Sequence, residues 1–170
     1  KDATISDNRK TLKQGGIITG ENGGTATVDS KNNTITLDNF KGNYPLEFNA
    51  EFTPNSITLI GDSTLSAVET KYQNLTISGS GSLTVGSIKV TNNDNIRADL
   101  PITGSATVIA GTATSDAKAI DITGDLTVNS GATLTATNTS ETKPTIDVTG
   151  KVTISGDPGT NAYTVSAHNS

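Results

Sequence analysis

The chain has 170 residues, a formal net charge of −5, no Cys and only 32% hydrophobic residues. The missing cysteines exclude disulfides and thiolate metal sites, and the acidic balance disfavours a nucleic-acid partner. No apolar run approaches the roughly 18 residues that cross a bilayer, so no membrane span is expected. The charged fraction is 17% and β-branched residues recur regularly, which argues against disorder and predicts one folded domain.

The first segment, residues 1–24, does not share the pattern of the rest of the chain. It opens without an initiating Met or an apolar signal region, which is typical of a mature or trimmed chain. Its basic residues are Lys1, Arg9, Lys10 and Lys13. We expect residues 1–24 to form an N-terminal cap or an irregular first coil, because the end of a stack of strands exposes unpaired backbone groups.

From residue 25 onward the chain repeats an apolar residue, a Thr and a second apolar residue. Alternation with period two predicts strands with apolar side chains on one face and Thr on the other. The triplets begin at Ala26, Ile35, Ile57, Leu75, Ala106, Leu126 and Val152. No helical periodicity is present, so the predicted fold class is all-β.

The triplets belong to longer repeats that contain three short strands each. Two early repeats are predicted to have strands at 46–48, 57–59 and 65–67, and at 70–72, 75–77 and 83–85. The two later repeats align best, because residues 120–128 (IDITGDLTV) match residues 146–154 (IDVTGKVTI). Their third strands are predicted at 134–136 and 163–165. In both, Thr-Gly makes a tight corner between the first two strands.

Three strands per repeat and a period of roughly 20–30 residues predict a parallel β-helix, in which successive repeats stack. The usual hand of parallel crossovers makes it right-handed. We expect a single β-helix domain of about six irregular coils over residues 25–170, with a thin core that needs few and small apolar side chains. An antiparallel sandwich is the rival fold, and the aligned copies favour the β-helix.

The outward Thr residues are predicted to stand in one column. They are Thr36, Thr58, Thr76, Thr107, Thr127 and Thr153. A regular array of hydroxyl and methyl groups is the kind of surface that ice-binding β-solenoids present. The preference of Thr for exposed strand positions explains the same pattern.

The segments 75–85 (LTISGSGSLTV) and 120–128 resemble repeats of secreted or surface-anchored bacterial right-handed β-helix proteins of the carbohydrate-binding-like and pectin-lyase-like kind. The resemblance covers roughly residues 26–165. It implies a bacterial extracellular or cell-surface location and contact with a glycan or another host or cell-surface component. No active-site motif of such proteins is matched, so the resemblance implies no catalytic residue.

Two insertions, residues 86–99 and 138–145, are predicted to bulge from the stack. In the first, Arg97 is a candidate ligand-binding residue beside Asp94 and Asp99. Asp94 and Asp99 are candidate ligands for calcium, which prefers oxygen donors. The spacing is not that of an EF-hand, and a solvated polar loop is the alternative.

Asp121 and Asp147 occupy equal positions in adjacent repeats and form a second candidate metal site. Their Cβ atoms are expected about 5 Å apart, where like charges cost stability. A bound calcium ion would relieve the repulsion, and so would an adjacent ion pair between Asp125 and Lys151. The alternative is a screened surface charge ladder. No other cofactor is expected.

Stacking against a sugar ring requires exposed aromatic side chains. Tyr44, Phe40 and Phe52 lie near predicted corners, and Tyr44 and Phe52 are the candidate ligand-binding aromatics. Phe48 has inward parity. His168 lies near the end of the sequence, where a rigid catalytic triad is not expected.

We therefore expect a non-enzymatic bacterial surface or secreted module for adhesion or glycan contact, either a monomer or part of a larger chain. A polysaccharide-active enzyme of the lyase or hydrolase kind and a structural spacer are the alternatives. A cleft with several carboxylates and Arg97 would favour the enzyme. An exposed Tyr44 or Phe52 beside a groove would favour glycan contact, and a featureless surface would favour the spacer.

Overall fold

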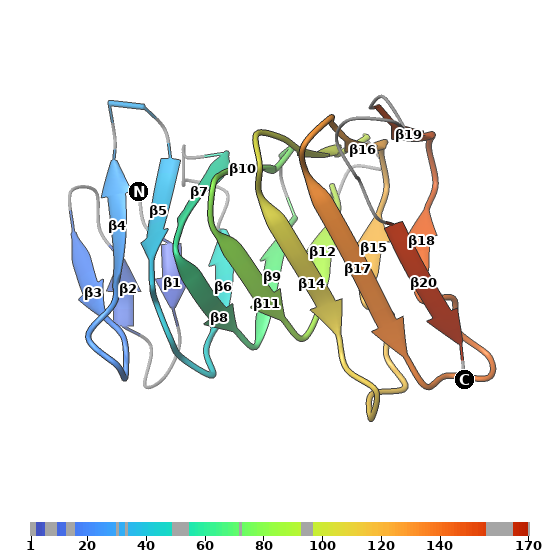
Figure 1. The fold of residues 1–170 in the computed structure, drawn as a ribbon, viewed down its shortest axis with the longest axis horizontal. Coiled ribbons are helices and arrows are strands. Elements are labelled where there is room, and N and C mark those ends of the chain that lie inside the picture. Colours follow the sequence, from blue (N-terminus) through green and yellow to red (C-terminus); the bar gives the residue numbers. More distant parts are fainter. Residues whose placement is uncertain are drawn as a thin grey trace.

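The computed structural model describes residues 3–5, 10–12, 16–29, 31–32, 34–48, 55–71, 73–92, 97–155 and 165–169. Regular structure within these residues consists of β-strands alone, which confirms the all-β class. The strands form three sheets, which we call A, B and C, and the sheets run along the long axis of the molecule (Figure 1).

Within each sheet, hydrogen bonds join the strands in a fixed spatial order. Sheet A contains β18 (Ile146–Val148), β15 (Ile120–Ile122), β12 (Ile88–Val90), β9 (Ala67–Thr70), β6 (Pro45–Phe48), β1 (Ala3–Ile5) and β2 (Lys10–Leu12). Sheet B contains β19 (Val152–Ile154), β16 (Leu126–Val128), β13 (Leu100–Ile102), β10 (Thr76–Gly79), β7 (Ser56–Ile60), β5 (Thr34–Asp38), β4 (Thr25–Asp29) and β3 (Ile17–Thr19). Sheet C contains β20 (Val165–Asn169), β17 (Thr133–Asn138), β14 (Thr107–Gly111), β11 (Ser82–Val85) and β8 (Asp62–Leu65).

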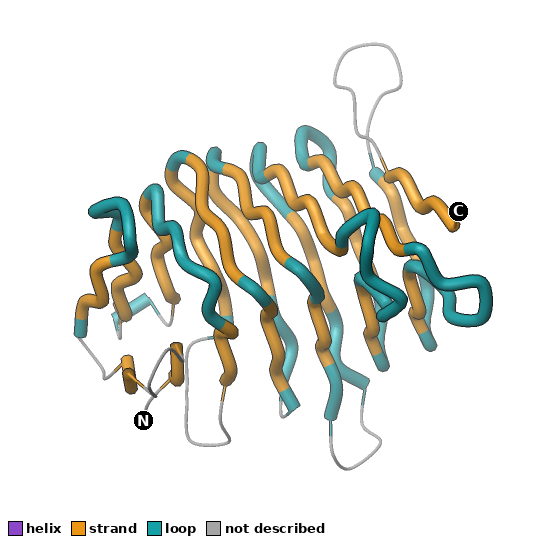
Figure 2. The backbone as a smooth tube through the Cα atoms, turned by 90° about the horizontal axis from the view of Figure 1, so that it is seen from below, coloured by secondary structure: helices purple, strands orange, loops and turns teal. Residues whose placement is uncertain are grey.

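From β7 to β20 the chain visits sheets B, C and A in rotation, and each strand lies beside the strand three places earlier. All pairs among β5 to β20 are parallel. Leu100, Leu126 and Val152 are in register in sheet B, as the aligned triplets predict for Leu126 and Val152. Figure 2 shows the strands of successive repeats side by side along the molecule. These parallel pairs exclude the antiparallel sandwich for this part of the chain.

The N-terminal strands differ in direction from the rest. β1 pairs antiparallel with both β2 and β6, and β4 pairs antiparallel with both β3 and β5. These strands lie at one end of sheets A and B, where the sequence predicts a cap for residues 1–24 (Figure 1). The antiparallel part extends beyond that prediction, because it includes β4.

The core is a narrow apolar layer that the three sheets enclose. Alternate residues of each strand are buried, as in β15 and β16, where the two outer residues are buried and the middle one is partly exposed. Leu126 and Leu134 are fully buried, and so are small side chains such as Ala106 and Ala136. Burial of one such Leu contributes about 1.5–3 kcal/mol, so a thin core suffices despite the low apolar content.

A ladder of Asn and Asp side chains ties successive repeats together where the chain enters sheet B. The Oδ1 atom of Asn74 accepts a hydrogen bond from the backbone N of Asp99 at 2.9 Å, and Asp99 Oδ1 accepts from the N of Asp125 at 2.7 Å. Asp125 Oδ1 accepts from the N of Lys151 at 2.6 Å. Gly124 is required beside this ladder, because a Cβ there would lie 2.1 Å from Asp99 Oδ1. We call Asn74, Asp99 and Asp125 the Asx ladder.

Two predictions on strand positions are wrong in detail. The predicted strands 65–67 and 70–72 are instead β8 and β9, because the single residue Ser66 makes the corner between them. The outward Thr residues fall into several columns: Thr36 aligns with Thr58, Thr76 aligns with Ser56, and Thr107 lies in sheet C. The predicted strands at 120–122, 126–128, 146–148 and 152–154 are confirmed.

Candidate functional site: a groove at the corner of sheets C and A

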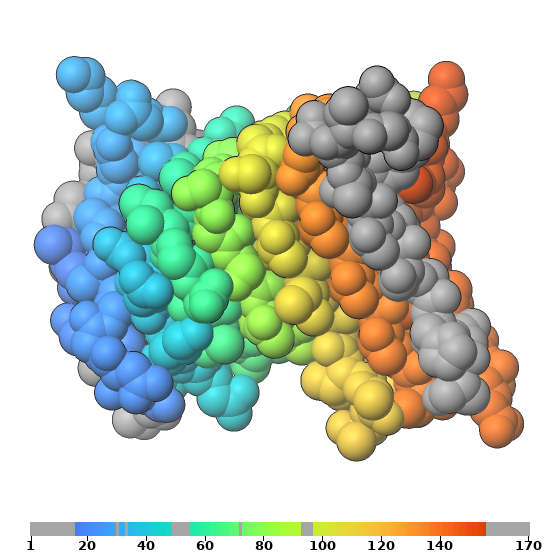
Figure 3. Space-filling view, in the orientation of Figure 1, coloured from blue at the N-terminus to red at the C-terminus, as the bar shows by residue number. Residues whose placement is uncertain are grey.

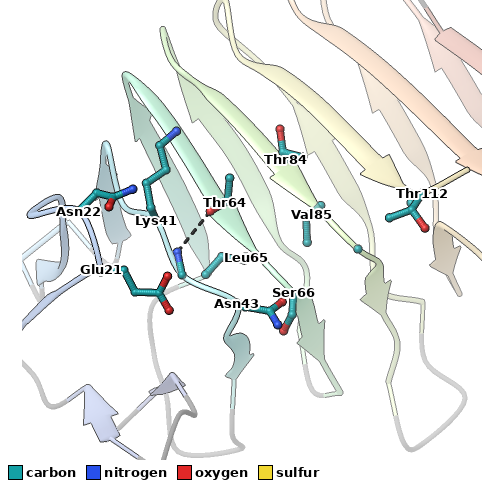
Figure 4. A pocket seen from close by; sticks show the side chains of 13 residues that line it. Glu21, Asn22, Lys41, Asn43, Thr64, Leu65, Ser66, Thr84, Val85 and Thr112 are labelled. Carbon is teal, nitrogen blue, oxygen red and sulfur yellow. Dashed lines mark hydrogen bonds between the residues drawn. The ribbon is translucent and has the colours of Figure 1, made fainter. Parts of the chain in front are cut away.

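An open groove of about 510 Å³ follows the corner at which the chain leaves sheet C and enters sheet A (Figure 4). We call it the corner groove. Its lining residues are Glu21, Asn22, Lys41, Gly42, Asn43, Thr64, Leu65, Ser66, Thr84, Val85, Gly86, Gly111 and Thr112. They come from the ends of β8, β11 and β14 and from two loops near the N-terminal end of the stack.

The floor of the groove exists because two corners are unusually tight. Ser66 alone separates β8 from β9, and Gly86 and Ser87 alone separate β11 from β12. A Cβ on Gly86 would lie 2.3 Å from the backbone O of Ser66 in the repeat below it. Glycine is therefore required for the two corners to stack this closely.

Longer loops raise the two walls above this floor. On one side, Glu21 N donates to Lys41 O at 2.9 Å, and Gly42 N donates to Thr64 Oγ1 at 3.2 Å, so both N-terminal loops are attached to the stack. On the other side, Thr112 begins the loop between β14 and β15. In Figure 3 the surface is hollowed between the N-terminal loops and this projecting loop, which is yellow.

The loop after Thr112 is supported by the predicted insertion at 138–145. Asn138 is fully buried, and its side-chain amide donates to Ala117 O at 3.2 Å and accepts from Thr145 Oγ1 at 2.9 Å. Thr139 N donates to Ser115 O at 2.8 Å. A buried amide with partners on both loops holds them in one arrangement, because leaving it unpaired would cost about 1–3 kcal/mol.

The lining is mostly neutral and rich in hydrogen-bonding groups. Asn22 and Asn43 offer amides, and four residues offer hydroxyls: Thr64, Ser66, Thr84 and Thr112. Glu21 and Lys41 are the charged residues of the lining, and Leu65 and Val85 contribute apolar surface. Such a mixture suits an uncharged ligand with many hydroxyl groups.

Tyr44, the predicted sugar-stacking residue, lies beneath one wall of the groove. Its ring is partly buried and packs on Phe40, with ring centroids 6.4 Å apart and planes at 55°. Its hydroxyl donates to Glu21 Oε1 at 3.1 Å. A Cβ on Gly42 would lie 2.4 Å from the Tyr44 ring. Tyr44 therefore positions the wall that carries Glu21, and Phe40, expected near the surface, is fully buried.

The predicted Arg97 site does not meet the groove. The Arg97 side chain is 60% exposed and forms an ion pair with Asp125, whose Oδ1 belongs to the Asx ladder. Asp99 also belongs to the ladder rather than to a cluster of carboxylates. Asp94 and Phe52 lie outside the described residues. The described part of the chain contains no group of three or more His, Asp or Glu side chains that could hold a metal ion.

Asp121 and Asp147 are in register, as predicted, but an ammonium group lies between them. Lys118 Nζ is 2.5 Å from Asp147 Oδ2 and 3.6 Å from Asp121 Oδ2. The hydrogen bond to Asp147 and the charges of both carboxylates raise the pKa of Lys118. Lys118 thus supplies the positive charge that the sequence interpretation left to calcium or to the neighbouring pair, and calcium binding at this position stays a prediction. The three-residue spacing of Lys118 and Asp121 was the available signal.

The chain was compared with models of protein families, with curated proteins and with solved structures, and none of them matches it. The described residues contain no helix long and apolar enough to cross a membrane. Function is therefore inferred from the arrangement of the three sheets and from the chemistry of the corner groove.

Proposed function

We propose that the chain is a right-handed parallel β-helix that acts as a non-enzymatic adhesion or glycan-contact module through its corner groove. The rotation through sheets B, C and A, with parallel pairing of each strand to the third strand before it, supports the β-helix. The usual hand of parallel crossovers supports its handedness.

The observation that carries the functional proposal is the neutral hydrogen-bonding lining of the groove. A sugar presents hydroxyl groups around its ring and apolar C–H surface on its faces. Asn43, Ser66 and Thr84 can serve the hydroxyl groups, and Leu65 and Val85 contribute apolar surface nearby. The groove is open rather than enclosed, which suits a stretch of a longer oligosaccharide.

The charges of the groove favour contact over catalysis. Glycoside hydrolysis ordinarily requires two carboxyl groups on either side of the scissile bond, and Glu21 is the one carboxylate in the described lining. Its Oε1 already accepts a hydrogen bond from Tyr44. Arg97, expected in a lyase-like cleft, is paired with Asp125 elsewhere. Asp121 and Asp147 do not line the groove, so the proposed contact uses no calcium ion.

A bacterial secreted or cell-surface location is part of the proposal and follows from the resemblance of the repeats at 75–85 and 120–128 to surface β-helix proteins. The repeated strand architecture is compatible with such a module, since function on a rigid scaffold is carried by its corners and loops. The corner groove would then face a glycan of a host or of another cell.

The proposal is tested by titrating the ¹⁵N-labelled chain with a panel of neutral gluco-, galacto-, manno- and xylo-oligosaccharides and recording amide shifts. We expect at least one to shift amides of Asn43, Ser66 and Thr84. Thr84→Val should weaken that binding about two- to tenfold, the value of one hydrogen bond of about 0.5–1.5 kcal/mol.

Thr135→Val is the matched control, because Thr135 stands in the same outward column of sheet C, separated from Thr84 by Ile109, and does not line the groove. It should leave the affinity unchanged. Shifts confined to other surfaces, or no shift with any member of the panel, would contradict the proposal and favour the structural spacer.

A further inference from the structure

The C-terminal end of the stack presents three open strand edges at one level. β18, β19 and β20 are the outermost strands of sheets A, B and C, and they pair with β15, β16 and β17 of the preceding repeat (Figure 1). Each has a neighbour on one side only. The end of the stack therefore offers a set of three edges with the cross-section of the stack itself.

The backbone groups on this edge can be assigned for β18 and β19. Lys151 O and Ser155 N both bond to β16, and Thr145 O and Thr149 N both bond to β15. Successive residues of a strand direct their N–H and C=O groups to opposite sides. The N–H and C=O groups of Val152 and Ile154 in β19, and of Ile146 and Val148 in β18, therefore face the open edge.

The same end exposes apolar side chains that the rest of the stack buries. Leu126 and Val128 have no exposed surface, whereas Val152 and Ile154, their register partners in the last repeat, are 53% and 38% exposed. Their position marks them as core residues that have lost the next layer. Exposed strand edges with apolar side chains promote pairing with another chain.

The charges at this end do not oppose the approach of a second, identical end. β19 has no charged side chain, and the charge of Asp147 in β18 is compensated by Lys118 at 2.5 Å. Two such ends related by a two-fold axis would not face each other with unpaired like charges from these two strands.

The opposite end of the molecule does not match this surface. Sheet B continues through the antiparallel strands β4 and β3, and sheet A continues through β1 and β2, whereas sheet C already ends at β8. Three edges at one level are thus absent there. At that end Ile18, the inward residue of β3, packs against the core.

We infer that two copies of this chain associate through their C-terminal ends, with β18, β19 and β20 of one copy stacked on the same edges of the other. A two-fold axis makes the contact isologous and closed, and it runs the facing strands antiparallel. This differs from the monomer expected from the sequence, and it does not depend on the proposed glycan contact.

Sedimentation equilibrium of the whole chain tests the inference, and the expected species has twice the 17.4 kDa of one chain. The three edges have 3, 3 and 5 residues. A contact of this size is smaller than a standard interface, so we expect a Kd between about 1 µM and about 1 mM.

Two variants at one position separate the apolar contact from edge pairing. Ile154→Lys places a charge on the edge, and Ile154→Pro removes an N–H that faces the open side without touching the bonds to β16. Each should raise the dimer Kd at least tenfold. Ile60→Lys is the matched control, because Ile60 is a 46% exposed Ile in β7 of the same sheet, away from the end, and it should leave the Kd unchanged.

Circular dichroism is recorded for each variant, so that a loss of folded structure is distinguished from a loss of association. A wild-type chain that remains monomeric at about 1 mM, the weak limit of the range expected for so small a contact, would overturn the inference. So would a folded Ile154→Lys or Ile154→Pro variant that dimerises as the wild type does, or a wild-type chain that forms open-ended oligomers larger than a dimer.

Discussion

The Asx ladder gives the sharpest stability prediction, because Asp99 can be changed in two ways that the structure separates. Asp99→Asn keeps an Oδ1 acceptor, and Asn74 shows that an amide oxygen performs the same task one repeat earlier, at 2.9 Å. Asp99→Ala removes the acceptor and leaves the backbone N of Asp125 without its 2.7 Å partner. The amide should therefore be tolerated and the Ala should not.

The expected magnitude follows from the loss of one partner for a part-buried N–H group. Such a loss costs about 1–3 kcal/mol, and for a chain of this length each kcal/mol lowers Tm by about 2–4 °C. Asp99→Ala should lose that amount in urea and thermal unfolding, and Asp99→Asn should stay within about 0.5 kcal/mol of the wild type, the range of an ordinary surface substitution. Equal losses for the two variants, or a neutral Asp99→Ala, would refute the ladder as a source of stability.

Three further predictions concern the groove wall and two charged groups. Gly42→Ala should displace the Tyr44 ring, lower Tm and shift the Tyr44 ring resonances, because the added Cβ would lie 2.4 Å from that ring. The raised pKa of Lys118 stabilises the fold fully below the unfolded value of 10.5, and this contribution is lost as pH rises through the higher folded pKa; Lys118→Met should therefore flatten the alkaline limb of the stability curve, with Lys31→Met unchanged. Hydrogen bonds from Asn32 lower the pKa of Asp29, so its contribution is present above 3.8 and is lost as pH falls through the lower folded value; Asp29→Asn should reduce the acid dependence of Tm.

The later repeats were predictable because each boundary carries a local signal. In residues 120–128 and 146–154 the Thr-Gly corner separates two apolar triplets, and β15, β16, β18 and β19 have the predicted bounds. Around Ser66 the signal is missing. One residue makes that corner without Gly or Pro, so the alternation of apolar residues continues from β8 into β9 and hides the boundary.

The groove was not predictable from local patterns, because its residues come from different repeats and carry no motif. Ser66, Thr84 and Thr112 are ordinary strand-end residues that only the stacking of tight corners brings together, and Asn22 and Asn43 join them from N-terminal loops. The in-register position of Asp121 and Asp147 did follow from the repeat offset, since both lie in aligned copies of one motif.

Strands about one repeat apart in the sequence are direct neighbours in sheet C, and this stacking places the corners that form the groove. The chain has no Cys, so the stacking is tested by the disulfide yield of Thr84→Cys/Ile109→Cys under mild oxidation. These residues are in register on adjacent parallel strands, about 4.8 Å apart, within the range that a disulfide spans.

The comparison variant is Thr84→Cys/Thr135→Cys, whose sites stand in the same column but two strands apart. Stacked repeats predict nearly complete intramolecular cross-linking of the first variant and almost none of the second, measured as the loss of two hydrogens by mass spectrometry and as free thiol content. Equal yields for the two variants, or a higher yield for the second, would contradict the stacking.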